Sequence, residues 1–247
     1  MSTKVFALIP ARYQSRRFPG KPLTLLHGKP LVQHCYESAS SCALFDRVVI
    51  ATDDQRIFDT AKGFGAEVVM TPESCPTGTD RIATALQMHP DLAEADIIVN
   101  VQGDEPQISA TTVSGLIELL KNDPEAQMAT AVVPLHTQEE LLDTSVVKCV
   151  FDCNGNALYF SRAPIPYGHG TADVRRQNYY GHVGIYAFRT QLLLKLHELA
   201  TTPLQQAEDL EQLRMMEHGH RIKVLEVEER ILGVDTPDDL KKVEELV

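Results

Sequence analysis

The sequence predicts an α/β fold, with a mostly parallel central sheet that carries helices on both faces. Through the first half of the chain, apolar runs of strand length alternate with longer segments of helical period. Alternation of this kind is typical of βαβ units. Runs such as DIIVNV and RVVIAT are also apolar at almost every position, which indicates strands that are buried on both sides.

The order of the elements follows from where each apolar run begins and ends. The predicted strands are Lys4–Pro10, Arg47–Ala51, Glu67–Met70, Asp96–Val101 and Met128–Val133. The predicted helices between them are Leu31–Cys42, Gln55–Phe64, Asp80–His89 and Thr111–Lys121. The earlier helices have start signals, because Pro30 suits the first turn of a helix and Asp54 suits a cap.

After about Pro134 the alternation loosens into short strand-like pieces. These are Val146–Phe151, Ala157–Phe160 and His182–Phe188, and the Asn-Gly of DCNGN predicts a hairpin between the first two. Helical patterns resume at Gln191 and Pro203, and the chain closes on the strand IKVLEV and the helix Pro237–Leu246. We therefore expect one domain over residues 1–247, with an inserted, smaller β-containing lobe over residues 134–188.

Composition excludes several classes of protein. The chain has 247 residues and a formal net charge of -11, which argues against a nucleic-acid surface. No apolar run approaches the roughly 18 residues of a membrane span, and no signal-peptide pattern is present, so we expect a cytoplasmic protein without membrane insertion. Five cysteines favour reduced thiols, and the spacing of Cys149 and Cys153 lacks the second ligand pair of a zinc site.

A cluster of cations follows the first predicted strand. Arg12, Arg16, Arg17 and Lys21 lie in a loop stiffened by glycine and proline, and its Gly-Lys-Pro-Leu recurs from Gly28. Neither a Walker loop nor a dinucleotide-binding glycine pattern is present. Because ligands bind beyond the carboxyl ends of parallel strands, this loop suits a triphosphate; the alternative is a solvated basic loop. The second copy starts a helix, so its role is structural.

Carboxylates follow other strand-like pieces. Asp104 and Glu105 come directly after VNVQG, and Asp235 comes after an apolar piece in LGVDTPDDL. One or two carboxylates, completed by water and phosphate oxygens, are what a Mg²⁺ site requires. The alternatives are a polar turn at Asp104 and an ordinary helix start at Asp235.

Two further groups are candidates for ligand binding. TGTDR places Thr79 and Arg81 at a helix N-terminus, where backbone N–H groups and the guanidinium favour an anion. His182 and Tyr186 share one face of a predicted strand, which suits a common pocket surface, although such a histidine is often an ordinary core residue.

Seven stretches, taken together and in order, resemble one family closely. They are IPARYQSRRFPGKPL, TGTDR, NVQGDEP, YFSRAPIPY, GHVGIYAF, LEQLR and GVDTPDDL. The chain resembles the 3-deoxy-manno-octulosonate cytidylyltransferases, also called CMP-Kdo synthetases, over nearly its whole length. The resemblance implies a Rossmann-like nucleotidyltransferase fold and the reaction of CTP with Kdo, with Mg²⁺, to give CMP-Kdo and pyrophosphate for lipopolysaccharide biosynthesis.

The resemblance also implies roles for individual residues. The catalytic set would be Arg12, Arg17, Lys21, Asp104 and Asp235, with Asp104 and Asp235 as the metal ligands. The nucleotide-binding set would be Leu8, Ala11, Arg12, Lys21, Thr79, Arg81 and Gln102. The sugar-binding set would be Gln102, His182, Tyr186, Glu211 and Gln212. The inserted lobe would serve sugar binding and the interface of a homodimer.

Two rival functions remain open at the level of sequence. One is a cytidylyltransferase for another acidic sugar, such as a sialic acid. The other is a catalytically silent nucleotide-binding regulator, against which the intact charged residues argue.

Overall fold

The computed structural model describes residues 3–14, 18–168, 179–228, 233–234 and 236–245 of the protein. The chain forms two compact units. The first comprises Met1–Val113, Phe188–His197 and Ile231–Val247, and the second comprises Ser114–Ala187 and Glu198–Arg230. The predicted lobe, residues 134–188, therefore corresponds to only part of the second unit, which also takes in segments on either side of it.

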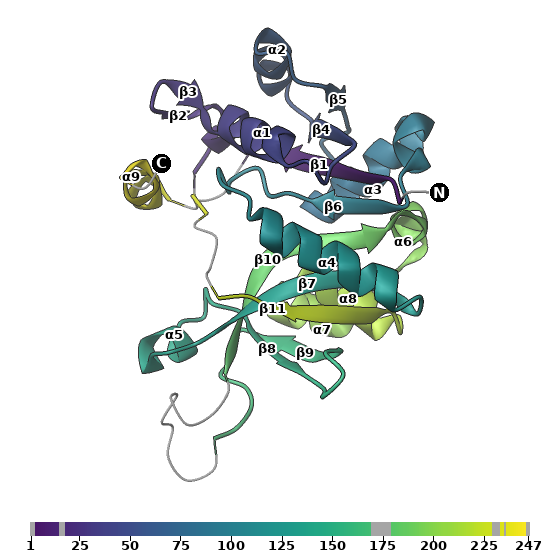
Figure 1. The fold of residues 1–247 in the computed structure, drawn as a ribbon. Helices are drawn as coiled ribbons and strands as arrows, with labels where there is room; N and C mark the ends of the chain where they lie inside the picture. The colour runs from purple at the N-terminus through teal and green to yellow at the C-terminus, as the bar shows by residue number, and fades with distance from the viewer. Residues whose placement is uncertain (1–2, 15–17, 169–178, 229–232, 235, 246–247) are drawn as a thin grey trace. The chain divides into compact units, whose positions relative to one another are not determined.

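The first unit is built on a parallel sheet. Its strands are β1 (Val5–Ala11), β4 (Arg47–Thr52), β5 (Val68–Met70) and β6 (Ile97–Asn100). They lie in the order β6-β1-β4-β5, and each neighbouring pair is parallel. Figure 1 shows β1, in purple, between β4 and β6. The chain builds outward from β1 to β5 and then returns to the other side of β1, so the direction of strand order reverses between β1 and β6.

Helices follow the strands of this unit in sequence. They are α1 (Leu31–Ser41), α2 (Gln55–Gly63), α3 (Gly78–Met88), α6 (Thr190–Leu194) and α9 (Pro237–Glu244), with 3-10 turns η1 (Lys21–Leu23) and η2 (Pro90–Glu94) and the small hairpin β2 (Leu25–Leu26) and β3 (Lys29–Pro30). Because βαβ crossovers are right-handed, the reversal of strand order sends α1 and α2 to one face and α3 to the other. Pro30 is the N-cap residue of α1, one position earlier than the first-turn location that the sequence suggested.

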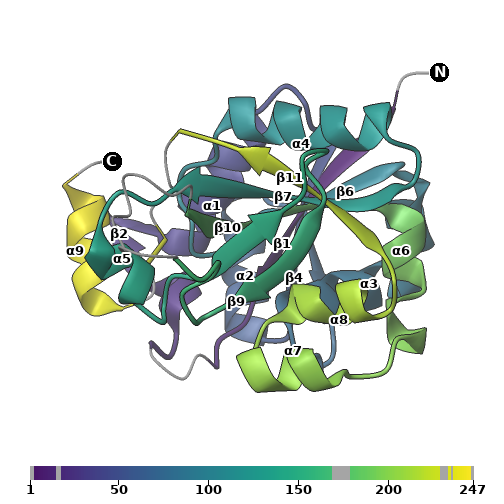
Figure 2. The same cartoon turned by 90° about the horizontal axis from the view of Figure 1, so that it is seen from below.

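The second unit combines a parallel pair with an antiparallel extension. Its strands are β7 (Ala126–Pro134), β8 (Lys148–Phe151), β9 (Ala157–Ser161), β10 (Tyr180–Arg189) and β11 (Arg221–Glu226). β11 runs parallel to β7, whereas β8 is antiparallel to both β9 and β10. The helices are α5 (Gln138–Leu142), α7 (Pro203–Glu208) and α8 (Glu211–Glu217), and α4 (Ala110–Asn122) enters from the first unit. Figure 2 shows α7 and α8 side by side.

The predicted hairpin between β8 and β9 is present, but its turn is longer than a two-residue loop. The N–H of Gly155 donates to the carbonyl of Asp152 at 2.9 Å, and the N–H of Asp152 donates to the carbonyl of Asn156 at 2.8 Å. Gly155 alone in this turn has a left-handed backbone, with φ of 72°. This is a type I turn followed by a glycine bulge, another common hairpin connection.

The predicted mostly parallel α/β fold is confirmed, and the differences lie at the ends of elements and in the second half. The strand predicted as His182–Phe188 extends over Tyr180–Arg189. The helical pattern around Glu208–His218 is interrupted at Asp209, whose φ of 53° ends α7 before α8 begins. Among the helices that the structure describes, none combines the length and the apolar character needed to cross a membrane.

Candidate active site

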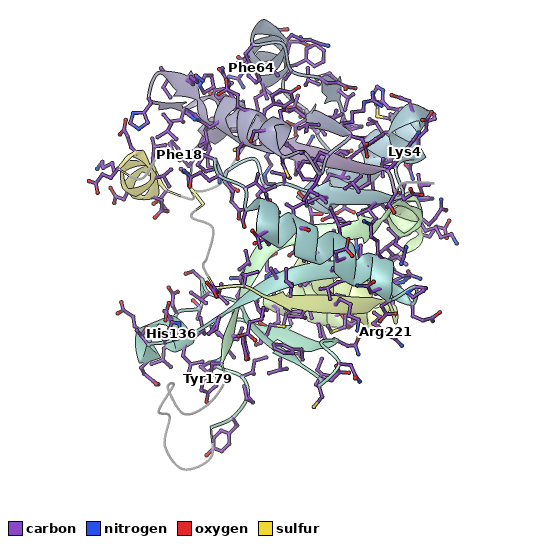
Figure 3. The ribbon with its side chains drawn as sticks, in the orientation of Figure 1. Lys4, Phe18, Phe64, His136, Tyr179 and Arg221 are labelled. Atoms are coloured by element: carbon purple, nitrogen blue, oxygen red, sulfur yellow. The ribbon has the colours of Figure 1, made fainter. Side chains whose placement is uncertain are left out.

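The carboxyl ends of β1 and β6 meet at the point where the strand order reverses. The N–H of Val101 donates to the carbonyl of Leu8 at 3.0 Å, which holds the start of the next loop against β1. A Cβ atom on Gly103 would lie 2.8 Å from the carbonyl oxygen of Pro10, so only glycine permits this approach. Figure 3 shows Lys4 at one end of β1 and Phe18 beyond the other end, which places the cationic loop at this carboxyl edge.

Lys21 and Asp104 form an ion pair at this edge. The Nζ of Lys21 donates to Oδ2 of Asp104 at 2.6 Å, and their side chains are 12% and 29% exposed. The pair joins the cationic loop to the carboxylate at the end of β6, as the sequence predicted for opposite charges around a metal–triphosphate site. Both groups are accessible enough to exchange this contact for a ligand.

A second segment reaches Asp104 from the C-terminal part of the chain. The N–H of Val234 donates to the carbonyl of Asp104 at 2.8 Å, and a Cβ on Gly233 would lie 3.6 Å from Cγ of Glu105. This contact brings the segment that precedes Asp235 next to the first carboxylate. Asp235 lies outside the described residues.

The carboxylates set the local potential, as a buried thiol on α1 shows. The pKa of Cys35 is raised well above its ordinary value, first by burial and then by the negative charges of Asp104 and Glu105. Lys21 acts on that pKa in the opposite direction and by a smaller amount. Oxygen donors with net negative charge suit a hard cation such as Mg²⁺, with Asp104 as a ligand, so the residues present fit this metal.

In the described part of the cationic loop, the residues between Ala11 and Lys21 are exposed or half-buried. Arg12 directly follows β1 and is exposed to solvent, where it can reach an anion. The guanidinium of Arg56 stacks on the ring of Tyr13, 3.4 Å from its centroid, and so adds a cation that the sequence analysis did not assign to this loop. Arg16 and Arg17 lie outside the described residues.

The buried side chain of Arg81 is held by two side chains of the same unit. It is 2% exposed; its Nη2 donates to Oδ2 of Asp53 at 2.5 Å and its Nη1 donates to Oγ1 of Thr71 at 2.6 Å. The guanidinium therefore ties α3 to the ends of β4 and β5. Contact with a ligand would have to use its remaining donors.

The other predicted nucleotide-binding residues lie along the same edge. Leu8 is fully buried in β1, Ala11 is the last residue of that strand, and Thr79 is fully buried in the first turn of α3. Gln102 is half-buried, two residues beyond β6. The fold thus brings these positions to one edge of one sheet, and their individual roles stay predictions.

In the second unit, His182 and Tyr186 lie on one face of β10, as predicted. Their rings pack with centroids 5.5 Å apart, and the ring of Phe160 meets His182 edge-on at 5.1 Å. The hydroxyl of Thr130 lies 2.8 Å from Nε2 of His182 and 2.9 Å from the carbonyl of Ile185. A hydroxyl has one hydrogen, so when Thr130 donates it to Ile185 it accepts from Nε2 of His182, which leaves Nδ1 as an acceptor in the neutral ring.

Gln212 has a buried polar group without a partner among the residues that the structure describes. Its side chain is on α8 and 1% exposed, and its Oε1 accepts from the hydroxyl of Tyr186 at 3.3 Å. Its Nε2 has no hydrogen-bond partner within the described part of the chain. Buried donors are normally paired, so a polar ligand or a water would complete this one. Glu211 precedes it at the first position of α8.

Sequence reasoning missed the side chains that hold these groups. Asp53 pairs with Arg81, Thr130 fixes His182, and Glu208 accepts hydrogen bonds from β9 and the residue after it. Asp53 directly follows β4, in the acidic stretch Thr52–Asp54, for which the sequence favours only a helix cap. Thr130 and Glu208 have no local pattern that distinguishes them from other polar residues.

Comparison with known proteins decides the family. A sequence model of the cytidylyltransferase family matches residues 6–223. The chain belongs to the cytidylyltransferase family. Within this cytidylyltransferase family, the 3-deoxy-manno-octulosonate cytidylyltransferase of Protochlamydia amoebophila is 47% identical over 99% of this chain and 95% of its own. The mitochondrial 3-deoxy-manno-octulosonate cytidylyltransferase of Arabidopsis thaliana is 44% identical over 99% of this chain and 83% of its own.

Solved structures agree with this membership. A structure of CMP:2-keto-3-deoxy-manno-octonic acid synthetase complexed with CTP superimposes with a TM-score of 0.91, at 41% identity, and covers 99% of this chain and 98% of that one. A cytidylyltransferase from Leptospira borgpetersenii gives a TM-score of 0.60 at 20% identity, which supports the fold alone.

Proposed function

We propose that the protein transfers CMP from CTP to the anomeric hydroxyl of Kdo, with release of pyrophosphate, as the names of its relatives indicate. The observation that carries the proposal is the pairing of Lys21 with Asp104 at 2.6 Å. It sets a cation suited to phosphate against a carboxylate suited to a metal at the reversal of strand order, where ligands bind in such folds.

In the reaction, the oxygen of the anomeric hydroxyl forms a bond to the α-phosphorus of CTP. The bond from that phosphorus to the pyrophosphate oxygen breaks, and the hydroxyl proton passes to solvent. Little covalent chemistry is required of the protein, so its contribution is orientation and charge stabilisation. Arg12 and Lys21, with Arg17, would hold the triphosphate.

Other residues would hold the metal ion and the sugar. Asp104 and Asp235 would hold Mg²⁺, which when bound supplies neutralisation of the phosphate charge. His182, Tyr186, Glu211 and Gln212 would bind the acidic sugar, and the strands of residues 134–188 would contribute to a homodimer interface. A cytoplasmic site of action in the synthesis of lipopolysaccharide is part of this proposal.

A coupled pyrophosphate-release assay tests it. We expect release with CTP, Kdo and Mg²⁺ together, and much less when ATP, GTP or UTP replaces CTP. Faster release with N-acetylneuraminic acid than with Kdo would assign the protein to another acidic sugar. Absence of release under every combination would contradict an enzymatic function.

A further inference from the structure

A reciprocal set of hydrogen bonds joins the end of β9 to the end of α7. The hydroxyl of Ser161 donates to Oε1 of Glu208 at 2.5 Å, and the N–H of Arg162 donates to Oε2 at 2.8 Å. In return, Nε of Arg162 donates to the carbonyl of Glu208 at 2.8 Å and Nη2 donates to the carbonyl of Asp209 at 3.4 Å. We call these contacts of Ser161, Arg162, Glu208 and Asp209 the β9–α7 clamp.

The clamp closes over a strained joint. Asp209 has φ of 53° and ψ of 52°, a left-handed conformation that costs energy in any residue with a Cβ atom. No side-chain cap holds the next residue, Leu210, at the start of α8. The clamp binds the carboxylate and the carbonyl of Glu208 and the carbonyl of Asp209, so it acts directly on the joint from which α8 begins.

The carboxylate of Glu208 is the centre of this arrangement. Besides Ser161 and Arg162, the hydroxyl of Tyr159 donates to it at 3.4 Å. Burial alone would raise its pKa, but these hydrogen bonds outweigh burial and the pKa of Glu208 is lowered. The group is therefore held as an anion, which makes its hydrogen bonds stronger than those between neutral groups.

We infer that Glu208 is a positioning residue for sugar binding: it fixes the joint at Asp209 and so sets where α8 presents Glu211 and Gln212. The inference rests on the proposed function, because it assigns those two residues to the acidic sugar. Gln212 shows why orientation matters, since its buried Oε1 is within 3.3 Å of the Tyr186 hydroxyl and a small rotation of α8 would separate them.

The chain offers a matched control on the same pair of helices. Glu217, on α8, accepts hydrogen bonds from the N–H groups of Leu204 and Gln205 at 3.1 and 3.2 Å. It also joins α7 to α8 by a carboxylate and backbone donors, but it does so at the far end of α7 from Asp209. Substitution of Glu217 therefore weakens the contact between α7 and α8 and leaves the joint at Asp209 unchanged.

The test compares Glu208→Ala, Glu208→Gln and Glu217→Ala. We expect Glu208→Ala to raise KM for Kdo about tenfold, the effect of losing a charged hydrogen bond, with KM for CTP unchanged. Glu208→Gln keeps one acceptor oxygen and should restore most of the affinity for Kdo. Glu217→Ala should leave both KM values unchanged.

Hydrogen exchange provides a readout that needs no substrate. We expect the amides of residues 210–214 to exchange faster in Glu208→Ala than in Glu217→Ala. If Glu208→Ala does not fold, Ser161→Ala, which removes the donor to Oε1 of Glu208, serves for both readouts. Equal exchange in all variants, or KM values for CTP and Kdo that change together, would overturn the inference. A wild-type protein that forms no CMP-Kdo would contradict the proposed function, while the exchange data would still decide whether the clamp holds α8.

Discussion

Lys21 and Lys29 occupy the same position in two copies of Gly-Lys-Pro-Leu, yet their surroundings differ. Lys21 pairs with Asp104 and its side chain is 12% exposed, whereas Lys29 pairs with Glu37 on the surface and its side chain is 48% exposed. We expect Lys21→Ala to lower kcat on the order of a hundredfold, about 3 kcal/mol of barrier, because it removes the charge that we propose to stabilise the leaving pyrophosphate. Pyrophosphate release under saturating CTP and Kdo measures this.

Lys29→Ala is the control for that substitution. It removes the same side chain from the same tetrapeptide, and its exposed ion pair contributes little, so activity and stability should match those of the wild type. A loss of less than about tenfold in Lys21→Ala would make Lys21 a surface lysine in function as well.

The buried thiol of Cys149 should make the stability of the protein fall in alkali. Burial raises the pKa of this thiol from 9.0 to about 12, so in alkali the unfolded chain ionises before the folded protein does. The stabilisation is complete below about pH 9 and is lost as the pH rises toward 12. We therefore compare the free energy of unfolding of the wild type with that of Cys149→Ala. The wild-type value minus the Cys149→Ala value should be smaller by ~2 kcal/mol at about pH 10.5 than at neutral pH.

Urea unfolding at the two pH values measures that difference. Cys153→Ala is the matched control, because it removes the same thiol from an exposed position in the turn that follows β8. A constant difference for Cys149→Ala would show that its thiol ionises in the folded protein.

Individual site residues could be predicted from the sequence where a charged side chain follows the end of a strand. Lys21 and Asp104 were identified because charged residues at strand ends are unusual enough to notice, and the structure brings them together. Glu208 was missed because its function depends on Ser161 and Arg162, which are separated from it by more than forty residues. A single sequence carries no trace of such a partnership.

At the scale of elements, Asp53 and Asp54 show how neighbouring carboxylates stabilise different structures. Asp54 caps α2 by accepting from the N–H of Arg56, and Asp53 pairs with the buried guanidinium of Arg81 on α3. We expect Asp53→Ala to destabilise the protein by about 3 kcal/mol, because it leaves a buried charge without its partner. Asp54→Ala should cost about 1 kcal/mol, the usual effect of a lost cap.

Chemical denaturation of the two variants checks this order. If Asp54→Ala proved the more damaging, Arg81 would be solvated or paired otherwise, and its predicted role in nucleotide binding would gain support. If Asp53→Ala is the more damaging, any loss of CTP affinity in an Arg81 variant must be corrected for its loss of stability.

Element prediction was reliable where long-range contacts agree with the local pattern. The strands of the first unit are apolar on both faces, so their location in a parallel sheet could be predicted from sequence. The break between α7 and α8 could not be predicted, because residues 208–218 have one amphipathic pattern and an aspartate, unlike a glycine, does not by itself indicate a left-handed backbone. The residues that contact this break, Ser161 and Arg162, lie at and just beyond the end of β9, far away in the sequence.

At the scale of the whole molecule, the division of the chain differs from the predicted inserted lobe. The loosening of pattern after Pro134 indicated a boundary there, but the second unit begins at Ser114 and includes Glu198–Arg230. The reason is β11, which returns from the end of the chain to pair with β7. Pairing between distant strands is the property that local periodicity does not contain.

The thermal stability of the protein should depend jointly on Mg²⁺ and nucleotide. Among the described residues, no group of three His, Cys, Asp or Glu side chains could hold a metal ion, and Asp104 is already paired with Lys21. Phosphate oxygens would have to complete the coordination of Mg²⁺. We therefore expect millimolar Mg²⁺ alone to leave Tm unchanged, CTP with a chelator to raise it slightly, and CTP with Mg²⁺ to raise it by several degrees.

The substitution Asp104→Asn separates the contribution of Mg²⁺ to the Tm increase from that of CTP. It removes the proposed metal ligand and also releases Lys21 to pair with phosphate, so the part of the Tm shift that depends on Mg²⁺ should vanish while the part due to CTP alone persists or grows. A Tm increase from Mg²⁺ alone would contradict this account, because it would require a metal site that the protein completes without nucleotide. An unchanged Mg²⁺ increment in Asp104→Asn would remove Asp104 from the metal site.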